Sequence, residues 1–186
     1  MDSRSRTLVR EAQARDGDPV ADALVLADRL RRGDLARDRL GVAAACGSEA
    51  ARLALGTEAT YSPVDYPTLL DRLPAVTLLP ALIAAAEAAL PHVGLGQEAA
   101  TAAACVLEAA RAFSVAPSDA ARARWEGSSG DWCREDGPTG WLPVQWTAQG
   151  AFFPNAMRAR LARCHNLAGD VVRPAVERAL LTWALA

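Results

Sequence analysis

The sequence predicts an all-α protein, and its composition and length carry this prediction. Apolar residues make up 51% of the 186 residues, and aromatic residues only 5%. Alanine dominates the apolar residues and β-branched residues are sparse, a mixture that favours closely packed helices over sheets. A chain of this length also buries enough surface to fold around one core without a metal or a disulfide. We therefore expect a compact bundle of about seven to nine helices, built partly from αα-hairpins.

The first helices are predicted from residues that commonly cap helix ends. Asp18 can accept hydrogen bonds from free amides, and Pro19 suits the first turn because its missing N–H has no partner there. A helix should therefore begin at Pro19 and end before Gly33. Its apolar residues recur at helical spacing, at Val20, Ala23, Leu24, Ala27 and Leu30. Two shorter helices, over 36–46 and 49–55, should follow as an αα-hairpin. The residues expected to cap or end them are Gly47, Ser48 and Gly56.

Apolar helices should dominate the middle of the chain. A brief helix over 66–72 should precede two long ones, over 76–90 and 97–113. Glu87 is the only charged residue of the first long helix. Pro80 and the many alanines nevertheless suit a buried core helix better than a membrane span. We therefore expect no contact with a membrane.

The chain changes character after a short helix expected over 118–126. Residues 127–154 contain five glycines, three prolines, three tryptophans and two phenylalanines. Flexible linkers lack this much apolar mass, so we expect an ordered, aromatic-rich loop packed across the helices. Helices should then resume over 156–167 and 171–184, with Gly169 between them.

These elements predict a single helical domain over residues 1–186. Its parts would be N-terminal αα-hairpins (1–56), apolar core helices (57–126), the aromatic loop (127–154) and a C-terminal helical pair (155–186). The chain has 20 arginines, no lysine and 22 acidic residues, which gives a net charge of −2. No segment is basic enough to bind nucleic acid through counterion release, so we expect no nucleic-acid partner.

The aromatic loop supplies the candidate binding residues. Rigid aromatic side chains offer a large contact area at little entropic cost, which suits a binding groove. The alternative is that the tryptophans only fix the loop to the helices, because large aromatic side chains are mostly buried. Acidic residues in the same loop could meet a basic partner or keep the loop soluble. The candidate residues are Trp132, Trp141, Trp146, Phe152, Asp131, Glu135 and Asp136.

Cysteine and histidine residues offer one catalytic alternative. Cys133 and His165 could act as nucleophile and base if the fold brings them together. The sequence contains no C-x-x-C or H-x-x-x-H pair, so we expect no metal site and no cofactor. The four cysteines are far apart and the N-terminus has no apolar signal segment, which together predict reduced thiols in the cytoplasm.

One short stretch resembles a known repeat. The run "AAACGSEAARLALG" resembles the junction between the two helices of a tetratricopeptide-type repeat of the Sel-one-like subfamily. The match rests on Ala44, Ala45, Gly47, Ala51, Leu55 and Gly56. Since no second copy follows one period later, the resemblance implies a helical hairpin and not an extended array of repeats.

A broader resemblance points to a function. The segments "RRGDLARDRLGVAAACGSEAARLALG", "ATAAACVLEAARAFSVAPSDAARAR" and "RPAVERALLTWALA" resemble parts of uncharacterised alanine-rich helical proteins of myxobacteria and other GC-rich bacteria. Some of those resemble immunity proteins of polymorphic toxin systems, which bind and block a toxin. Together with the composition of the aromatic, acidic loop, which we expect to be the contact surface, this predicts a non-catalytic cytoplasmic module that binds a protein partner, as an immunity or adaptor protein. The alternative is an enzyme or small-ligand-binding protein with a pocket between residues 127–154 and the helices.

Overall fold

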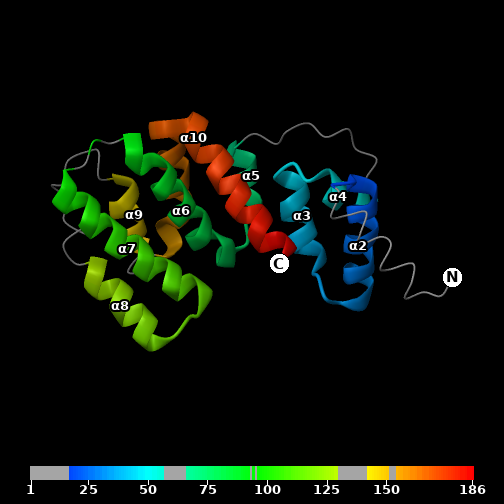
Figure 1. The fold of residues 1–186 in the computed structure, drawn as a ribbon, viewed down its shortest axis with the longest axis horizontal. Helices are drawn as coiled ribbons and strands as arrows, with labels where there is room; N and C mark the ends of the chain where they lie inside the picture. Colours follow the sequence, from blue (N-terminus) through cyan, green and yellow to red (C-terminus); the bar gives the residue numbers. More distant parts are fainter. Residues whose placement is uncertain (1–16, 57–65, 93, 95, 130–141, 151–153) are drawn as a thin grey trace. The chain divides into compact units, whose positions relative to one another are not determined.

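The computed structural model describes residues 17–56, 66–92, 94, 96–129, 142–150 and 154–186 (Figure 1). Regular structure in these residues is entirely helical, and they contain no β-strand. The prediction of an all-α protein is therefore confirmed. The expected caps and the apolar spacing account for most of the helices, but two parts of the chain fold differently from the prediction.

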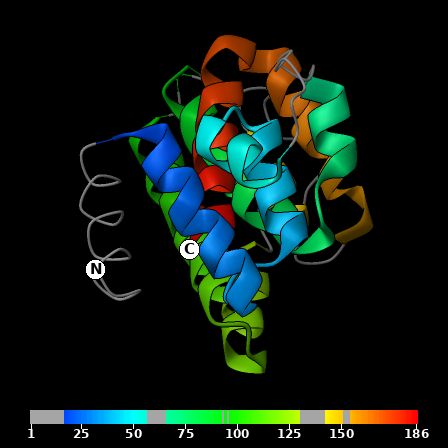
Figure 2. The ribbon, with the colours of Figure 1, turned by 90° about the vertical axis from the view of Figure 1, so that its right-hand side faces the viewer.

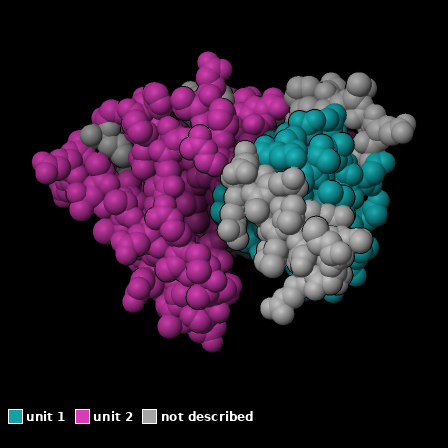
Figure 3. Space-filling view, turned by 45° about the vertical axis from the view of Figure 1, so that its right-hand side comes forward, with its two compact units in different colours: residues 1–65, 180–186 teal, residues 66–179 magenta. Residues whose placement is uncertain are grey.

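The chain divides into two compact units, coloured separately in Figure 3. Unit 1 comprises residues 1–65 and 180–186, and unit 2 comprises residues 66–179. The last helix, α10 (Met157–Leu185), contributes residues to both units. The expectation of a single domain stays a prediction, and each unit is described by itself below.

Unit 1 is built on a helical hairpin with a third helix packed against it. α2 (Pro19–Arg32), α3 (Arg37–Ala45) and α4 (Glu49–Ala54) follow one another in the chain. α4 packs against both α2 and α3, and Figure 2 shows the three helices together. The predicted αα-hairpin is confirmed, and its helix bounds differ from the prediction by only one residue.

The caps of unit 1 form as the sequence predicts. The Asp18 carboxylate accepts a hydrogen bond from the backbone N–H of Val20 at 2.9 Å. Gly33 ends α2 in the left-handed region, with φ +79°, which glycine adopts without steric strain. The Ser48 hydroxyl accepts a hydrogen bond from the backbone N–H of Ala51 at 3.2 Å. These bonds satisfy amides that have no partner within their helices.

Unit 2 contains the long apolar helices. α6 (Ala75–Ala89) packs against α7 (Gln97–Val115), and α9 (Leu142–Gly150) packs against both. Small side chains fill one part of this core, which lets the helices approach closely. The fully buried members of that cluster are Ala103, Val106, Val144 and Ala148.

Shorter elements complete unit 2. α8 (Asp119–Ser129) lies against α7 and α9, and the Ser118 hydroxyl accepts a hydrogen bond from the N–H of Ala121 at its start. The predicted start of this helix is therefore confirmed. α5 (Tyr66–Arg72) precedes α6 as expected. Short 3₁₀ turns occupy Leu90–His92 and Pro154–Ala156.

α6 is the most apolar helix of unit 2. With its following turn, over Ala75–His92, it is long and apolar enough to cross a membrane by length and composition alone, and half of this window is buried in the structure. Leu82, Ala85 and Ala86 are fully buried. Packing against α7 and α9 therefore gives its apolar side chains a place inside unit 2.

The predicted aromatic loop over 127–154 is wrong in two places. Residues 127–129 end α8, and residues 142–150 form α9. The frequent glycine and proline in this stretch suggested a loop, but Val144 and Ala148 are buried in the core of unit 2. Burial of nearly all the described side chains of α9 outweighs the weak local propensity. Residues 130–141 and 151–153 lie outside the described part of the chain.

The predicted break at Gly169 is also wrong. α10 continues as one α-helix of 29 residues from Met157 to Leu185. A glycine inside a helix costs only about 1 kcal/mol relative to alanine. The apolar stripe that the helix buries runs past this glycine at helical spacing, and that burial outweighs the cost. The buried side chains of the stripe are Leu161, Cys164, Val172, Val176, Leu180 and Ala184.

Candidate functional site

The predicted aromatic and acidic site falls mostly outside the described residues. Trp146 is the one member of it that the structure describes, and it is buried on α9, with 7% of its surface exposed. Trp146 therefore packs inside unit 2. The members outside the described residues are Trp132, Trp141, Phe152, Asp131, Glu135 and Asp136. For these the binding site stays a prediction.

Trp125 shows how aromatic packing organises this part of unit 2. It lies on α8, is 2% exposed, and its ring centroid is 5.4 Å from that of Phe113 on α7. Gly150, at the end of α9, lies so close to the Trp125 ring that a Cβ there would contact it at 3.4 Å. This is an ordinary van der Waals distance, so the end of α9 packs directly against the indole. The indole thus joins three helices of unit 2.

Two buried polar groups stand out beside this packing. The indole Nε1 of Trp125 and the hydroxyl of Ser129 are buried and have no hydrogen-bond partner in the described part of the chain. Both lie on α8, four residues and so about one turn apart. Buried donors of this kind are rare because leaving them unpaired costs free energy. Each of the two groups can donate one hydrogen bond to an acceptor.

The described thiols differ sharply in their surroundings. Cys46 and Cys164 are buried, whereas Cys105 is exposed on α7. Burial raises the pKa of the Cys164 thiol from 9.0 to about 12, because a thiolate would lose its hydration there. At neutral pH this sulfur is a protonated packing atom and not a nucleophile.

The candidate pair of Cys133 and His165 remains a prediction. Cys133 lies outside the described residues, and His165 is half-buried on α10. His165 follows Cys164 directly, and adjacent side chains on a helix point about 100° apart. In the described residues, no three His, Cys, Asp or Glu side chains are placed to hold a metal ion.

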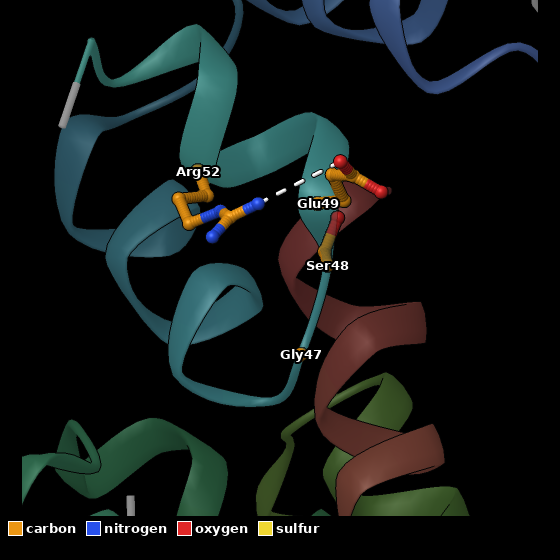
Figure 4. A pocket seen from close by; sticks show the side chains of 4 residues that line it. All are labelled: Gly47, Ser48, Glu49 and Arg52. Atoms are coloured by element: carbon orange, nitrogen blue, oxygen red, sulfur yellow. Dashed lines mark ion pairs between the residues drawn. The ribbon is translucent and has the colours of Figure 1, made fainter. Parts of the chain in front are cut away.

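A small pocket lies at the turn between α3 and α4 (Figure 4). Its volume is about 200 Å³, and it is lined by Gly47, Ser48, Glu49 and Arg52. The Arg52 guanidinium points toward the Glu49 carboxylate at 3.6 Å. Pockets that enclose cofactors and drug-sized ligands are larger, roughly 300–1,000 Å³. This pocket is a polar surface feature of the helical turn.

Exposed apolar side chains form a second candidate surface, on α2. Val20 is 57% exposed and Leu24, one turn further along, is 42% exposed. Leu53 on the neighbouring α4 is 43% exposed. The helical spacing of Val20 and Leu24 had suggested that they face the core, but α2 buries Ala21, Ala23 and Leu26 instead. Periodicity could not separate the two faces because apolar residues occupy both.

Comparison with known proteins assigns no family to this chain. No protein family model, no curated protein and no solved structure matches it.

Proposed function

We propose that this protein is a non-catalytic, protein-binding helical module that acts as an immunity or adaptor protein in the cytoplasm. The observation that carries the proposal is the exposed apolar pair Val20 and Leu24, on consecutive turns of α2 in unit 1. Contiguous exposed apolar surface marks sites where another protein binds, and Val20 and Leu24 adjoin on one face of α2. Leu53 on α4 extends the apolar character to the neighbouring helix.

The charges around this pair favour a protein partner over a nucleic acid. Asp22 lies on the same helix in its first turn, and Arg31 and Arg32 near its end are paired with Asp28. Their positive charge is thus partly neutralised within α2, leaving little to attract phosphates. We expect the partner to present an apolar surface of its own to Val20 and Leu24.

A pull-down with matched variants tests this function. The wild-type protein, Val20→Glu/Leu24→Glu and the control Val76→Glu/Val115→Glu would be immobilised and exposed to a lysate of the native host. Val76 and Val115 are exposed valines of unit 2, at 64% and 81%, so the control adds the same charge elsewhere. We expect wild type and control to retain the same protein, and the α2 variant to retain about tenfold less of it. Equal retention by all three would contradict the proposal.

A small-ligand-binding function is the second candidate. It is supported by the buried Trp125 Nε1 and Ser129 hydroxyl, which could donate hydrogen bonds to a ligand acceptor. This candidate predicts that neither pair of glutamate substitutions changes which proteins are retained. The same pull-down therefore separates the two functions.

A further inference from the structure

Two arginines of unit 1 hold the carboxyl end of α10. Arg29, on α2, donates hydrogen bonds to the carbonyl oxygens of Leu185 and Ala186, at 2.7 and 3.0 Å. Arg39, on α3, donates to the carbonyl oxygen of Trp183. The last carbonyls of a helix have no partner within the helix and carry partial negative charge. Guanidinium groups are therefore well matched to this end of α10.

The Trp183 ring adds a second kind of recognition. The guanidinium of Arg39 lies over this ring, 4.9 Å from its centroid, in a cation–π contact. Arg39 thus recognises both the backbone and the side chain of Trp183. Leu180 and Ala184, which lie one turn apart in the same segment, are fully buried. Within unit 1, residues 180–186 therefore contribute carbonyls and a ring that contact Arg29 and Arg39, together with two buried apolar side chains.

The docked arrangement, in which residues 180–186 contact Arg29 and Arg39, also has a cost in free energy. The Nε of Arg39 is buried, yet it has no hydrogen-bond partner among the residues that the structure describes. A buried, unpaired donor of a charged group opposes the state that buries it. Leu181, Trp183 and Leu185 are only half-buried in the docked segment. The unpaired donor and the partial burial of these three side chains make the free energy of docking smaller than the number of contacts suggests.

We propose that Arg29 and Arg39 form a recognition site for the carboxyl end of an α-helix, and that residues 180–186 occupy this site reversibly. The site is distinct from the apolar pair of the proposed function. Arg29 follows Val20 by nine residues, about two and a half helical turns, so the two side chains lie on opposite sides of α2. The occupant that fits is a helix end with free carbonyls and an aromatic residue in its last turn.

Peptide competition in the full chain tests the site. The probe is a fluorescein-labelled peptide with the sequence of residues 176–186 and an amidated end, so that only carbonyls are offered. Its binding would be followed by fluorescence anisotropy. In wild type the tethered segment competes at high effective concentration. In Trp183→Ala this segment is weakened, and we expect the probe to bind at least about tenfold more tightly than to wild type.

Arginine variants in the Trp183→Ala background complete the design. Adding Arg29→Ala/Arg39→Ala should lower probe affinity about tenfold or more, because the carbonyls lose their donors. The matched control adds Arg31→Ala/Arg37→Ala, which removes exposed arginines from the same two helices and should leave binding unchanged. The proposal is overturned if Trp183→Ala binds no better than wild type, or if binding survives the loss of Arg29 and Arg39.

Hydrogen exchange provides a second readout that does not need Trp183→Ala to fold. Arg29→Ala/Arg39→Ala should speed amide exchange of residues 181–185 about tenfold, with the protected amides of α2 unchanged. Equal acceleration across α2, α3 and residues 181–185 would show that the segment does not leave independently, and would overturn the proposal.

Discussion

At the scale of single residues, arginine makes polar contacts between parts of the described chain that are far apart in the sequence. Arg158 on α10 donates hydrogen bonds to the carbonyl oxygens of Leu70 and Leu73, at and just beyond the end of α5. Arg29 likewise contacts two carbonyls with two nitrogens. The planar guanidinium fork makes such paired contacts possible, and a lysine ammonium lacks this fork. At Arg29 and Arg158 the fork therefore has a structural use that lysine could not fulfil.

Replacement of Arg158 by lysine measures this use. Arg158→Lys keeps the charge but should lose at least one of the two hydrogen bonds to α5, and we expect the free energy of unfolding to fall by about 1–2 kcal/mol. Urea unfolding followed by circular dichroism gives this value. Arg163→Lys, an exposed arginine on the same helix, is the control and should change stability by less than about 0.5 kcal/mol. An equal effect of both substitutions would show that the carbonyl contacts contribute nothing.

At the scale of helices, the ends were easier to predict from sequence than the interiors. The side chains of Asp18 and Ser48 cap amides only two or three residues away, and Gly33 ends α2 through its own backbone conformation. Local sequence therefore determines where these helices begin and end. α9 and the middle of α10 depend on burial against distant parts of the chain. Local composition around Gly150 and Gly169 therefore suggested a loop and a break where the structure has helices.

The candidate sites also divide into features that local sequence predicts and features that depend on packing between distant parts of the chain. Sequence reasoning singled out tryptophans because they are large, and Trp146 is buried as large aromatics generally are. It did not find the exposed Val20 and Leu24, since their exposure depends on which face of α2 meets α4. It also could not pair Arg39 with Trp183, because 144 residues separate them.

Two exposed glycines of unit 1 allow a comparison of how glycine affects stability inside a helix and at a helix end. Gly41 lies inside α3 with open space where a Cβ would stand, whereas Gly33 ends α2 with φ +79°. We expect Gly41→Ala to raise the free energy of unfolding by about 0.5–1 kcal/mol, since alanine loses less backbone entropy. Gly33→Ala should lower it by about 1 kcal/mol, because a Cβ is strained at positive φ.

Thermal unfolding of both glycine variants beside wild type would give these shifts. Neither position has an atom within 4 Å of an added Cβ, so steric clashes do not confuse the comparison. Shifts of the same sign for Gly41→Ala and Gly33→Ala would contradict the assigned backbone conformations.

At the scale of the whole molecule, α10 is the element that belongs to both units. Its residues up to Ala179 are part of unit 2, and Leu180–Ala186 are part of unit 1. Val176 and Leu180 are both fully buried and lie one turn apart, on either side of this boundary. Truncation of Val176 should therefore destabilise unit 2, whereas truncation of Leu180 should destabilise unit 1.

Truncation of these two side chains tests whether the units open separately. Val176→Ala should speed amide exchange mainly in α6, α7 and α9, and Leu180→Ala mainly in α2, α3 and α4, because each cavity weakens the unit in which it lies. Exchange measured by mass spectrometry on peptides from each helix would show the pattern, with about tenfold faster exchange for each 1.4 kcal/mol lost. If both variants speed exchange equally in all six helices, the chain opens as one cooperative domain. That result would favour the single domain that the sequence predicts, because both units would then unfold together.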